Sequence, residues 1–378
     1  MAQIRILEIL EAAGGGALKH VSQIAEHLDK DEFDLTVAIS PARMRNPQRE
    51  IQRLRAFGVR VEAIPMKRRP APFADLRALR ALARLIRRNR YDVVHAHSSK
   101  AGFLGRRAAR EAGTSKVFYT PHAFAFQCGG ASGWLYKRLE RMGAGFGGVI
   151  VAVSEGEKEL VVRNRIASAD RVRVIRNAIE APPEITAETR AEARAALGLP
   201  QHAPVAGTVG RLVRQKGCEY LVRAAKDVIQ RHEDARFVLI GDGGLDARLR
   251  SLTKQLGIAE NVVFAGHRAD AAGLYAAMDL YVQPSLWEGL SYSVLEAMGR
   301  GLPVVATDIS GNTDVVKDGA TGLVVPPGDA QAIAEAVRLL LDDVERRREL
   351  GQAARELVLS RHSLADFIEA IADLYRGG

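Results

Sequence analysis

Short apolar runs alternate with amphipathic stretches of helical period along nearly the whole chain. Such runs, with helices between them, predict parallel β-sheets that helices cover on both faces. The predicted strands form two sets. In the first half of the chain they span residues 4–9, 35–39, 59–64, 93–97, 117–120 and 148–153. In the second half they span residues 205–208, 237–240, 262–265, 280–283, 303–306 and 322–325.

The break between the two sets is marked by Pro182 and Pro183, which end regular structure before a helix predicted over residues 187–197. We therefore expect an α/β fold with two Rossmann-like, doubly wound domains that face a cleft. Because ligands bind beyond the carboxyl ends of parallel strands, candidate site residues are those that directly follow a predicted strand. The expected parts are a first domain (1–178), a second domain (179–360) and a C-terminal helical segment (361–378). The sequence leaves open whether this segment crosses back to the first domain.

Length and composition exclude several classes of protein. The 378 residues suit two domains of ordinary size, and 47% hydrophobic with 26% charged residues is a normal globular balance. No apolar run reaches the roughly 18 residues that a membrane-spanning helix needs. Glu8 and Glu11 interrupt the first apolar stretch, which therefore resembles a buried strand rather than a secretory signal. Cys128 and Cys218 fit neither a zinc spacing nor a disulfide framework, so we expect a reducing, cytoplasmic location.

The positive charge of the chain is concentrated in one segment. Residues 41–90 hold fifteen Lys or Arg and three acidic residues, a net charge of +12, whereas the whole chain carries +9. A nucleic acid, an anionic membrane surface or a phosphorylated substrate could each use this charge, and so could solvent. Aromatic residues are not interleaved with these arginines, which argues against nucleic acid.

In each half of the chain, a glycine-containing loop follows the first predicted strand. Gly14–Gly16 precede a helix predicted over residues 18–27, where backbone N–H groups and the helix N-terminus favour a phosphate. The loop is not GxGxxG, so a tight turn without a ligand is the alternative. In the second loop, GTVGRLVRQKG, Arg211 and Lys216 could neutralise a diphosphate, although they could also be two surface cations.

The stretch WEGLSYSVLEAMGRGLPVVATD places two carboxylates around the start of a predicted helix. Ser293 and Glu296 match the S-x-x-E capping box, which gives Glu296 a possible structural role. Glu288 has no such role in its loop. Because a buried Glu without a partner is costly, we expect it to be exposed or bound to a partner.

Histidines follow two further strands, in HAHSSKAG and TPHAF. A metal site at His95 and His97 is disfavoured, because only His122 lies nearby in the sequence and no carboxylate follows. His122 comes directly after a strand and Pro121, and either a structural or a ligand-binding role is open to it. No Ser-His-Asp order and no GxSxG motif occurs. We therefore expect Arg and Lys, not a metal, to neutralise a bound diphosphate, and we expect no cofactor.

Together these motifs resemble the large retaining glycosyltransferase family with the GT-B fold, often called family 4 or group 1. The resemblance covers nearly the whole chain, and its most specific element is E-x7-E, here Glu288 and Glu296, followed by EAMGRGLPVVAT. The pair Arg211 and Lys216 and the Gly15-Gly16 loop match in order and position. The family often has Glu where Leu18 stands, and Gly where Ser291 stands, so the donor sugar and the acceptor are left open.

The resemblance implies a metal-independent enzyme that moves a sugar from a nucleotide-diphosphate sugar, with UDP favoured, and retains the anomeric configuration. It implies that Glu296 binds the ribose, that Glu288 contacts the sugar and that Arg211 and Lys216 hold the diphosphate. His122 matches a histidine that reaches the donor sugar. The remaining implied nucleotide-sugar contacts are Gly15, Gly16, Gly289, Leu290, Ser291 and Tyr292.

The segments HSSKAG and TPHAFAF further resemble enzymes that extend lipid-linked sugars for capsule, exopolysaccharide or O-antigen assembly. A polyprenyl-diphosphate-linked acceptor and peripheral contact with the inner face of an anionic membrane would fit the basic first domain. Trp134, Tyr136, Lys137 and Arg138 either extend that surface or belong to a packed helix. The alternatives are a GT-B nucleotide-sugar epimerase or phosphorylase and, from a different class, a nucleotide-regulated nucleic-acid-binding protein.

Overall fold

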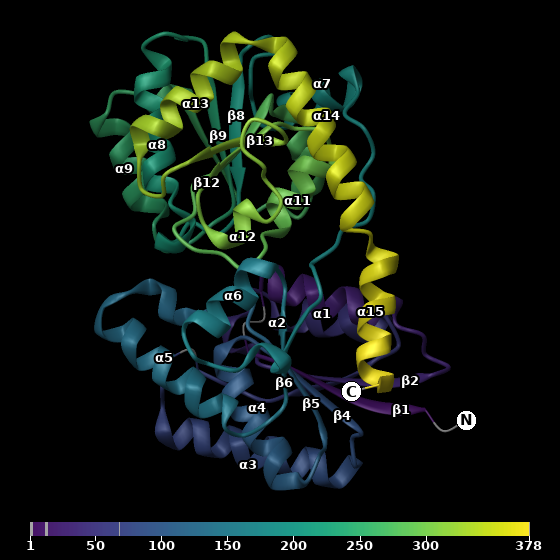
Figure 1. Ribbon diagram of the computed structural model, residues 1–378. Helices are drawn as coiled ribbons and strands as arrows, with labels where there is room; N and C mark the ends of the chain where they lie inside the picture. The colour runs from purple at the N-terminus through teal and green to yellow at the C-terminus, as the bar shows by residue number, and fades with distance from the viewer. Residues whose placement is uncertain (1–2, 12–13, 68, 378) are drawn as a thin grey trace. The chain divides into compact units, whose positions relative to one another are not determined.

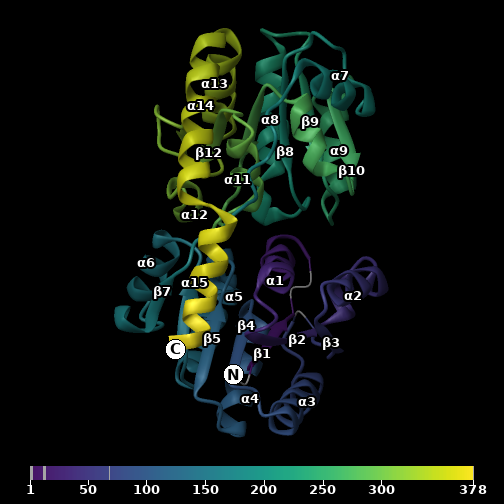
Figure 2. The same cartoon turned by 90° about the vertical axis from the view of Figure 1, so that its right-hand side faces the viewer.

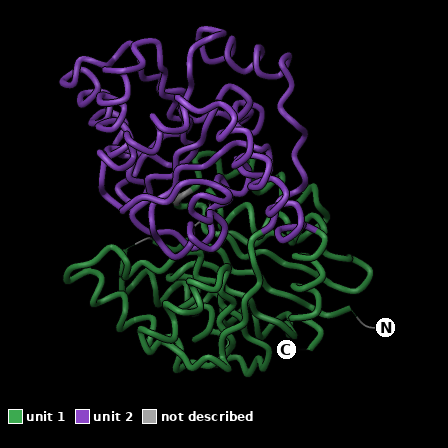
Figure 3. The backbone as a smooth tube through the Cα atoms, turned by 45° about the horizontal axis from the view of Figure 1, so that its top comes forward, with its two compact units in different colours: residues 1–177, 365–378 green, residues 178–364 purple. Residues whose placement is uncertain are grey.

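The computed structural model describes residues 3–11, 14–67 and 69–377. The chain divides into two compact units, which Figure 3 shows in different colours. Unit 1 comprises residues 1–177 and 365–378, and unit 2 comprises residues 178–364. The division falls one residue before the predicted domain boundary, and the last helix of the chain is part of unit 1. None of the described helices is long and apolar enough to cross a membrane.

Unit 1 contains a parallel sheet of seven described strands in the order β3-β2-β1-β4-β5-β6-β7 (Figure 1). The strands are β1 (Ile4–Leu10), β2 (Phe33–Ile39), β3 (Arg60–Ala63), β4 (Val93–His97), β5 (Lys116–Thr120), β6 (Val149–Ala152) and β7 (Val172–Val174). The α-helices are α1 (Gly16–His27), α2 (Pro47–Ala56), α3 (Pro72–Asn89), α4 (Ser99–Ala112), α5 (Gly130–Ala144), α6 (Glu155–Arg163) and α15 (Leu364–Gly377).

Unit 2 contains a parallel sheet of six described strands in the order β10-β9-β8-β11-β12-β13. The strands are β8 (Val205–Val209), β9 (Arg236–Ile240), β10 (Val262–Gly266), β11 (Leu280–Gln283), β12 (Val304–Thr307) and β13 (Gly322–Val325). The α-helices are α7 (Ala187–Ala196), α8 (Cys218–Ile229), α9 (Asp246–Gln255), α10 (Ala271–Leu274), α11 (Tyr292–Gly299), α12 (Ser310–Thr313), α13 (Ala330–Asp342) and α14 (Val344–Arg361). Figure 2 shows helices on both faces of each sheet, so the α/β prediction with two Rossmann-like domains is confirmed.

The alternation of side chains along β1 separates two faces of the sheet in unit 1. Leu7 and Ile9 belong to the apolar core beneath α3 and α4. Glu8, between them, points to the opposite face because successive side chains of a strand alternate. There it accepts a hydrogen bond from Tyr375 of α15, which also contacts His95 of β4. The central strands therefore carry an apolar face and a face with buried polar groups.

The strand order of each unit reverses beside its first strand. In unit 1 the chain proceeds from β1 to β2 on one side and returns to β4 on the other. In unit 2 the same reversal occurs between β8 and β11. Loops after such neighbouring strands lead in opposite directions, which leaves a crevice at their carboxyl ends where ligands bind. The residues after these four strands are therefore the first candidates for a site.

The strands predicted over residues 93–97, 280–283 and 322–325 have the predicted bounds, and the other predicted strands agree within two residues. β7 is missing from the prediction. Its three residues have Arg173 at the centre, which gives no apolar run, and it is held by pairing with β6.

Candidate active site

The loop after β8 in unit 2 is shaped by a glycine that no other residue can replace without strain. The short 3-10 helix Arg214–Lys216 ends at Gly217, whose φ is +63°. A Cβ atom there would lie 1.9 Å from the carbonyl oxygen of Pro284, in the loop that follows β11. The two loops therefore approach each other closely, and Lys216 is carried to the neighbouring loop.

Glu288 lies buried in the loop after β11, with 7% of its surface exposed. Its Oε1 atom is 2.6 Å from the Nζ atom of Lys216 and accepts a hydrogen bond of 2.9 Å from Ser285. Gln283 and Gln215 lie at the edge of hydrogen-bonding distance, 3.5 Å from its two oxygens. The prediction that Glu288 is exposed or bound is thus resolved: it is buried and paired with a cation.

A close backbone contact also holds the loop that contains Glu288. A Cβ atom on Gly311 of α12 would lie 1.5 Å from the carbonyl oxygen of Gly289. Thr307, at the end of β12, donates a hydrogen bond of 2.6 Å to the carbonyl oxygen of Ser285. The loop is consequently fixed from two sides, as a preorganised binding loop requires.

Glu296 lies on α11 and accepts a hydrogen bond of 2.8 Å from the hydroxyl of Tyr275. Arg300, one turn later, stacks over the Tyr275 ring at 5.0 Å. The capping-box interpretation of Glu296 is wrong. The residue before the helix is Ser291, whose side chain makes no capping hydrogen bond, and Ser293 already lies inside the helix. The Glu296 carboxylate is therefore oriented by the Tyr275 phenol and not by a capping hydrogen bond to Ser293.

Four of the remaining predicted residues of unit 2 lie between Glu288 and Glu296 in the chain. Gly289 and Leu290 are buried in the loop, and Ser291 and Tyr292 form the start of α11. Arg211, two residues after the end of β8, is exposed and has a partner within the structure. Backbone N–H groups at a helix start, together with cations, form a site that suits an anion.

In unit 1, the predicted glycine loop and His122 lie at the carboxyl ends of central strands. Gly15, with φ +63°, precedes the first residue of α1, and there is open space where a Cβ atom would be. His122, two residues after β5, has φ +55°, and Ser98, directly after β4, has φ +73°. Positive φ values cost energy in residues with a Cβ atom and concentrate at functional sites.

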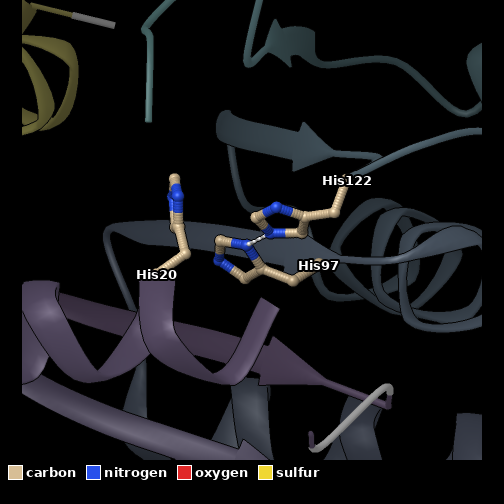
Figure 4. A group of neighbouring side chains, drawn as sticks. All are labelled: His20, His97 and His122. Carbon is tan, nitrogen blue, oxygen red and sulfur yellow. Dashed lines mark hydrogen bonds between the residues drawn. The ribbon is translucent and has the colours of Figure 1, made fainter. Parts of the chain in front are cut away.

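Three imidazoles meet beyond the ends of β4 and β5, as Figure 4 shows. His97 Nδ1 lies 3.0 Å from His122 Nε2, and the two rings are stacked at 5.2 Å. His20 of α1 packs edge-on against His122 at 4.7 Å. On its far side, His97 Nε2 lies 2.5 Å from Glu8 Oε2, in the centre of the sheet.

Burial keeps these histidines neutral. It lowers the pKa of His20 and of His97 to about 3, and lowers the pKa of His95 and of His122 well below the usual value. Burial also raises the pKa of the Glu8 carboxyl, against the opposing effects of His95 and of the Tyr375 hydrogen bond. We call Glu8 together with the imidazoles of residues 20, 95, 97 and 122 and the phenol of residue 375 the histidine network.

The histidine network could not be assembled from the sequence. Among the described residues, the sets His20, His97, His122 and Glu8, His95, His97 each come close enough to share a metal ion. In the sequence only His122 lies near His95 and His97, whereas the fold also brings Glu8 and His20 close to them. A glutamate inside an apolar strand was the available signal for Glu8, whereas no local pattern distinguishes His20.

Two family models match the chain. Residues 189–357 match the glycosyl transferases group 1 family, and residues 15–178 match the glycosyl transferase 4-like domain. The chain is 31% identical over 307 residues to the UDP-Gal:alpha-D-GlcNAc-diphosphoundecaprenol alpha-1,3-galactosyltransferase of Escherichia coli, and this match covers 80% of the chain and 79% of the relative. It is 30% identical to the putative glycosyltransferase EpsD of Bacillus subtilis, with 83% and 84% covered.

Solved structures share the fold across the whole chain. A complex of HepE from Anabaena with UDP and glucose superimposes with a TM-score of 0.86 at 22% identity, and the match covers 100% of both chains. WaaG, a glycosyltransferase involved in lipopolysaccharide biosynthesis, superimposes with a TM-score of 0.78 at 17% identity, covering 99% of this chain and 100% of WaaG. Both the sequence relatives and the fold therefore lead to the same conclusion: the chain belongs to the group 1, or family 4, glycosyltransferases with the GT-B fold.

Proposed function

We propose that this glycosyltransferase moves a sugar from a UDP-sugar to a lipid-linked sugar acceptor, with retention of the anomeric configuration, during the assembly of a surface polysaccharide. The observation that carries the donor part is the arrangement of Glu288, Lys216 and Glu296 at the point where the strand order of unit 2 reverses. Two carboxylates and a helix start in one stretch of chain, with a cation brought to them from the loop after β8, match the needs of a ribose, a diphosphate and a sugar.

Each residue has a distinct task in this proposal. Glu296 accepts hydrogen bonds from the ribose hydroxyls, and Arg211 and Lys216 neutralise the diphosphate as it leaves, without a metal ion. Glu288 accepts a hydrogen bond from a sugar hydroxyl, and Lys216 is shared between that carboxylate and the phosphate. His122 contributes a further contact to a sugar hydroxyl. The acceptor attacks from the face of the leaving group, and the departing phosphate takes its proton.

The nucleotide and the acceptor are supported by the relatives. The Escherichia coli relative is named for a UDP-Gal donor and a diphosphoundecaprenol-linked acceptor. Another relative, 27% identical over 322 residues, is the CapM capsular polysaccharide biosynthesis glycosyltransferase of Staphylococcus aureus. We therefore favour uridine as the base and a polyprenyl diphosphate as the acceptor's carrier.

Contact with a membrane surface is supported by two helices of unit 1. α3 begins with the exposed side chains of Phe73 and Leu76 and carries an exposed cationic stripe along its length. The stripe consists of Arg77, Arg80, Arg84, Arg87 and Arg88. On α5, Trp134 is 60% exposed while other residues of the helix are buried, so this helix both packs and presents an aromatic ring. Apolar tips beside cations suit an anionic bilayer surface.

A panel of nucleotide sugars, scored for thermal stabilisation and for slow hydrolysis, tests the proposed donor. UDP-sugars should stabilise the protein more than GDP- or ADP-sugars, and one UDP-sugar should be hydrolysed. Transfer to a synthetic polyprenyl-diphosphate sugar, followed by NMR of the product, then tests acceptor and stereochemistry. An inverted product would reject the proposed mechanism, and preference for a purine nucleotide would reject the proposed donor.

A further inference from the structure

The strongest feature outside the nucleotide residues is the histidine network of unit 1. A carboxylate in the middle of a sheet is costly unless it is hydrogen-bonded. Glu8 is fully buried, yet each of its oxygens has a close partner: Oε1 lies 2.5 Å from the Tyr375 hydroxyl and Oε2 lies 2.5 Å from His97 Nε2. Glu8 is therefore satisfied by groups from two different elements, β4 and α15.

The directions of these hydrogen bonds follow from one assignment. If Glu8 is a carboxylate, both oxygens accept, so the proton of His97 must be on Nε2 and Nδ1 must carry a lone pair. That lone pair faces His122 Nε2 at 3.0 Å, which must then be the protonated nitrogen. His122 Nδ1 is left as a hydrogen-bond acceptor.

The other branch of the network is consistent with the same assignment. The Tyr375 hydroxyl donates to Glu8, so toward His95 Nδ1, at 2.8 Å, it accepts. His95 Nε2 is then the acceptor for the hydroxyl of Thr120, also at 2.8 Å. Each described hydrogen bond in both branches then contains one proton. The donor and acceptor of every bond follow from the fact that Glu8 accepts at both of its oxygens.

We propose that Glu8, through His97, fixes the tautomer of His122 so that its Nδ1 atom accepts a hydrogen bond from a substrate hydroxyl group. Glu8, His97 and Tyr375 are then positioning residues, and this inference rests on the proposed function for the contact of His122 with a sugar. A neutral imidazole that presents a lone pair selects a hydroxyl, whereas an imidazole that presents N–H would suit a phosphate oxygen. The network thereby separates sugar recognition from diphosphate recognition.

The geometry favours a relay of hydrogen bonds over a shared metal ion. Ligands of one metal ion direct their lone pairs at a common point. In Figure 4 the His97 and His122 nitrogens point at each other along their hydrogen bond, and one proton between them satisfies both. The neutral state of both rings, which burial enforces, is the state that the relay needs.

The relay can be tested first in the unmodified full chain, by nitrogen NMR of protein labelled at histidine. At neutral pH, His97 and His122 should each be protonated on Nε2, and His95 on Nδ1. Signals are assigned from the spectra of single histidine substitutions. Protonation of His122 on Nδ1, or uptake of Zn²⁺ by His97 and His122, would overturn the proposal.

A matched pair of hydroxyl deletions tests the role of Glu8. Tyr375→Phe removes a donor to buried Glu8, and Tyr119→Phe removes a donor to Glu140, another buried glutamate of unit 1. On acidification, protonation of Glu8 reverses the branch that ends at His122. The groups that face Glu8 are His95 and His97 from β4, His20 from α1 and Tyr375 itself. The pH of tautomer reversal should rise in Tyr375→Phe and stay unchanged in Tyr119→Phe, and equal behaviour of the two variants would contradict the relay.

Kinetics connects the relay to catalysis. Glu8→Leu removes the acceptor that orders the relay, and should lower kcat/KM by about tenfold or more, the value of one ordinary hydrogen bond. UDP affinity should be unchanged, because the proposed UDP contacts other than the Gly15-Gly16 loop lie in unit 2. If UDP does not bind the unmodified protein, the proposed function is refuted. The tautomers of the relay are then still determined by the NMR spectra, which do not depend on UDP. If UDP binds and Glu8→Leu has full activity, the inference fails alone.

Discussion

The ion pair between Lys216 and Glu288 allows a quantitative prediction for the stability of unit 2. The two side chains are only 16% and 9% exposed, and their charged atoms lie 2.6 Å apart. Removing one partner of a buried pair typically costs about 3–5 kcal/mol, because the other charge is left without compensation. Since Ser285 still donates to Glu288, we place Lys216→Ala at the lower end, about 3 kcal/mol. For a unit of this size the transition midpoint should fall by roughly 6–12 °C.

The cause of that loss can be isolated with a second substitution. Glu288→Gln keeps the shape of the side chain but removes its charge, and should cost about 1 kcal/mol or less alone, because the Lys216 ammonium group retains contact with solvent. With a coupling free energy of about 2 kcal/mol, the double variant should be less destabilised than Lys216→Ala alone, at a total cost of about 2 kcal/mol or less. Urea unfolding and calorimetry of the three variants measure this cycle.

A control comes from an exposed ion pair on the next helix. Arg223 and Glu219 are paired at 2.8 Å on α8, but their side chains are 48% and 26% exposed. Arg223→Ala should therefore cost less than about 1 kcal/mol. This prediction is refuted if the losses in unfolding free energy of Lys216→Ala and Glu288→Gln are additive, or if Lys216→Ala costs no more than Arg223→Ala. In either case Lys216 does not compensate a buried charge on Glu288.

Four further outcomes are expected. Glu296→Ala should weaken UDP binding, measured by calorimetry, whereas Glu288→Gln should keep UDP affinity and lower kcat. Equal effects of the two substitutions on UDP binding would contradict the separate roles of the two glutamates. Arg211→Ala should lower turnover about 10²-fold. A chelator should leave the unmodified enzyme active, and complete loss of activity with the chelator would show that a metal is needed. The double substitution Arg80→Glu and Arg84→Glu should reduce co-sedimentation with anionic vesicles, because each cation contributes roughly 1 kcal/mol to the binding free energy. Equal binding of the unmodified protein to neutral vesicles would show that charge does not drive the interaction. The free energy of unfolding should fall by about 1.4 kcal/mol per pH unit for each neutral buried imidazole of the histidine network as pH falls from about 6.5 toward 3, because the unfolded chain binds these protons. Glu8, whose folded pKa is raised, offsets one imidazole only between that pKa and its ordinary value of 4.5. A flat profile of urea unfolding against pH in this range would contradict the assignment.

The sequence predicted the fold and the neighbourhood of the nucleotide residues because both depend on local patterns. Apolar runs of strand length are visible without any knowledge of tertiary contacts, and the residues after each run must lie at one edge of the sheet. Glu288 and Glu296 are close in the chain, so a single stretch carries both. The capping interpretation of Glu296 failed for the same local reason: S-x-x-E occurs, but the N-cap is Ser291, two residues before Ser293, and the helix begins at Tyr292.

Contacts between distant segments were beyond the sequence. Lys216 and Glu288 are separated by three strands in the chain (β9, β10 and β11) and meet because β8 and β11 are neighbours in the sheet. The histidine network needs still more: the register that sets Glu8 opposite His95, the packing of α1, and the return of α15 to unit 1. No spacing rule relates Tyr375 to a residue of the first strand.

The same physical logic governs the buried carboxylates of both units. Glu288 is paired with the Lys216 ammonium group, whereas Glu8 accepts hydrogen bonds from two neutral donors, the Tyr375 hydroxyl and His97. An ion pair can exchange one partner for another when an anionic ligand arrives, so Lys216 is available to a phosphate. A carboxylate that accepts hydrogen bonds from fixed neutral groups instead determines which nitrogen of each neighbouring imidazole carries the proton. In the proposed relay, this leaves His122 Nδ1 as the acceptor for a sugar hydroxyl. In the proposed function, the two buried carboxylates would therefore act on different chemical groups, a phosphate beside Lys216 and a hydroxyl group beside His122.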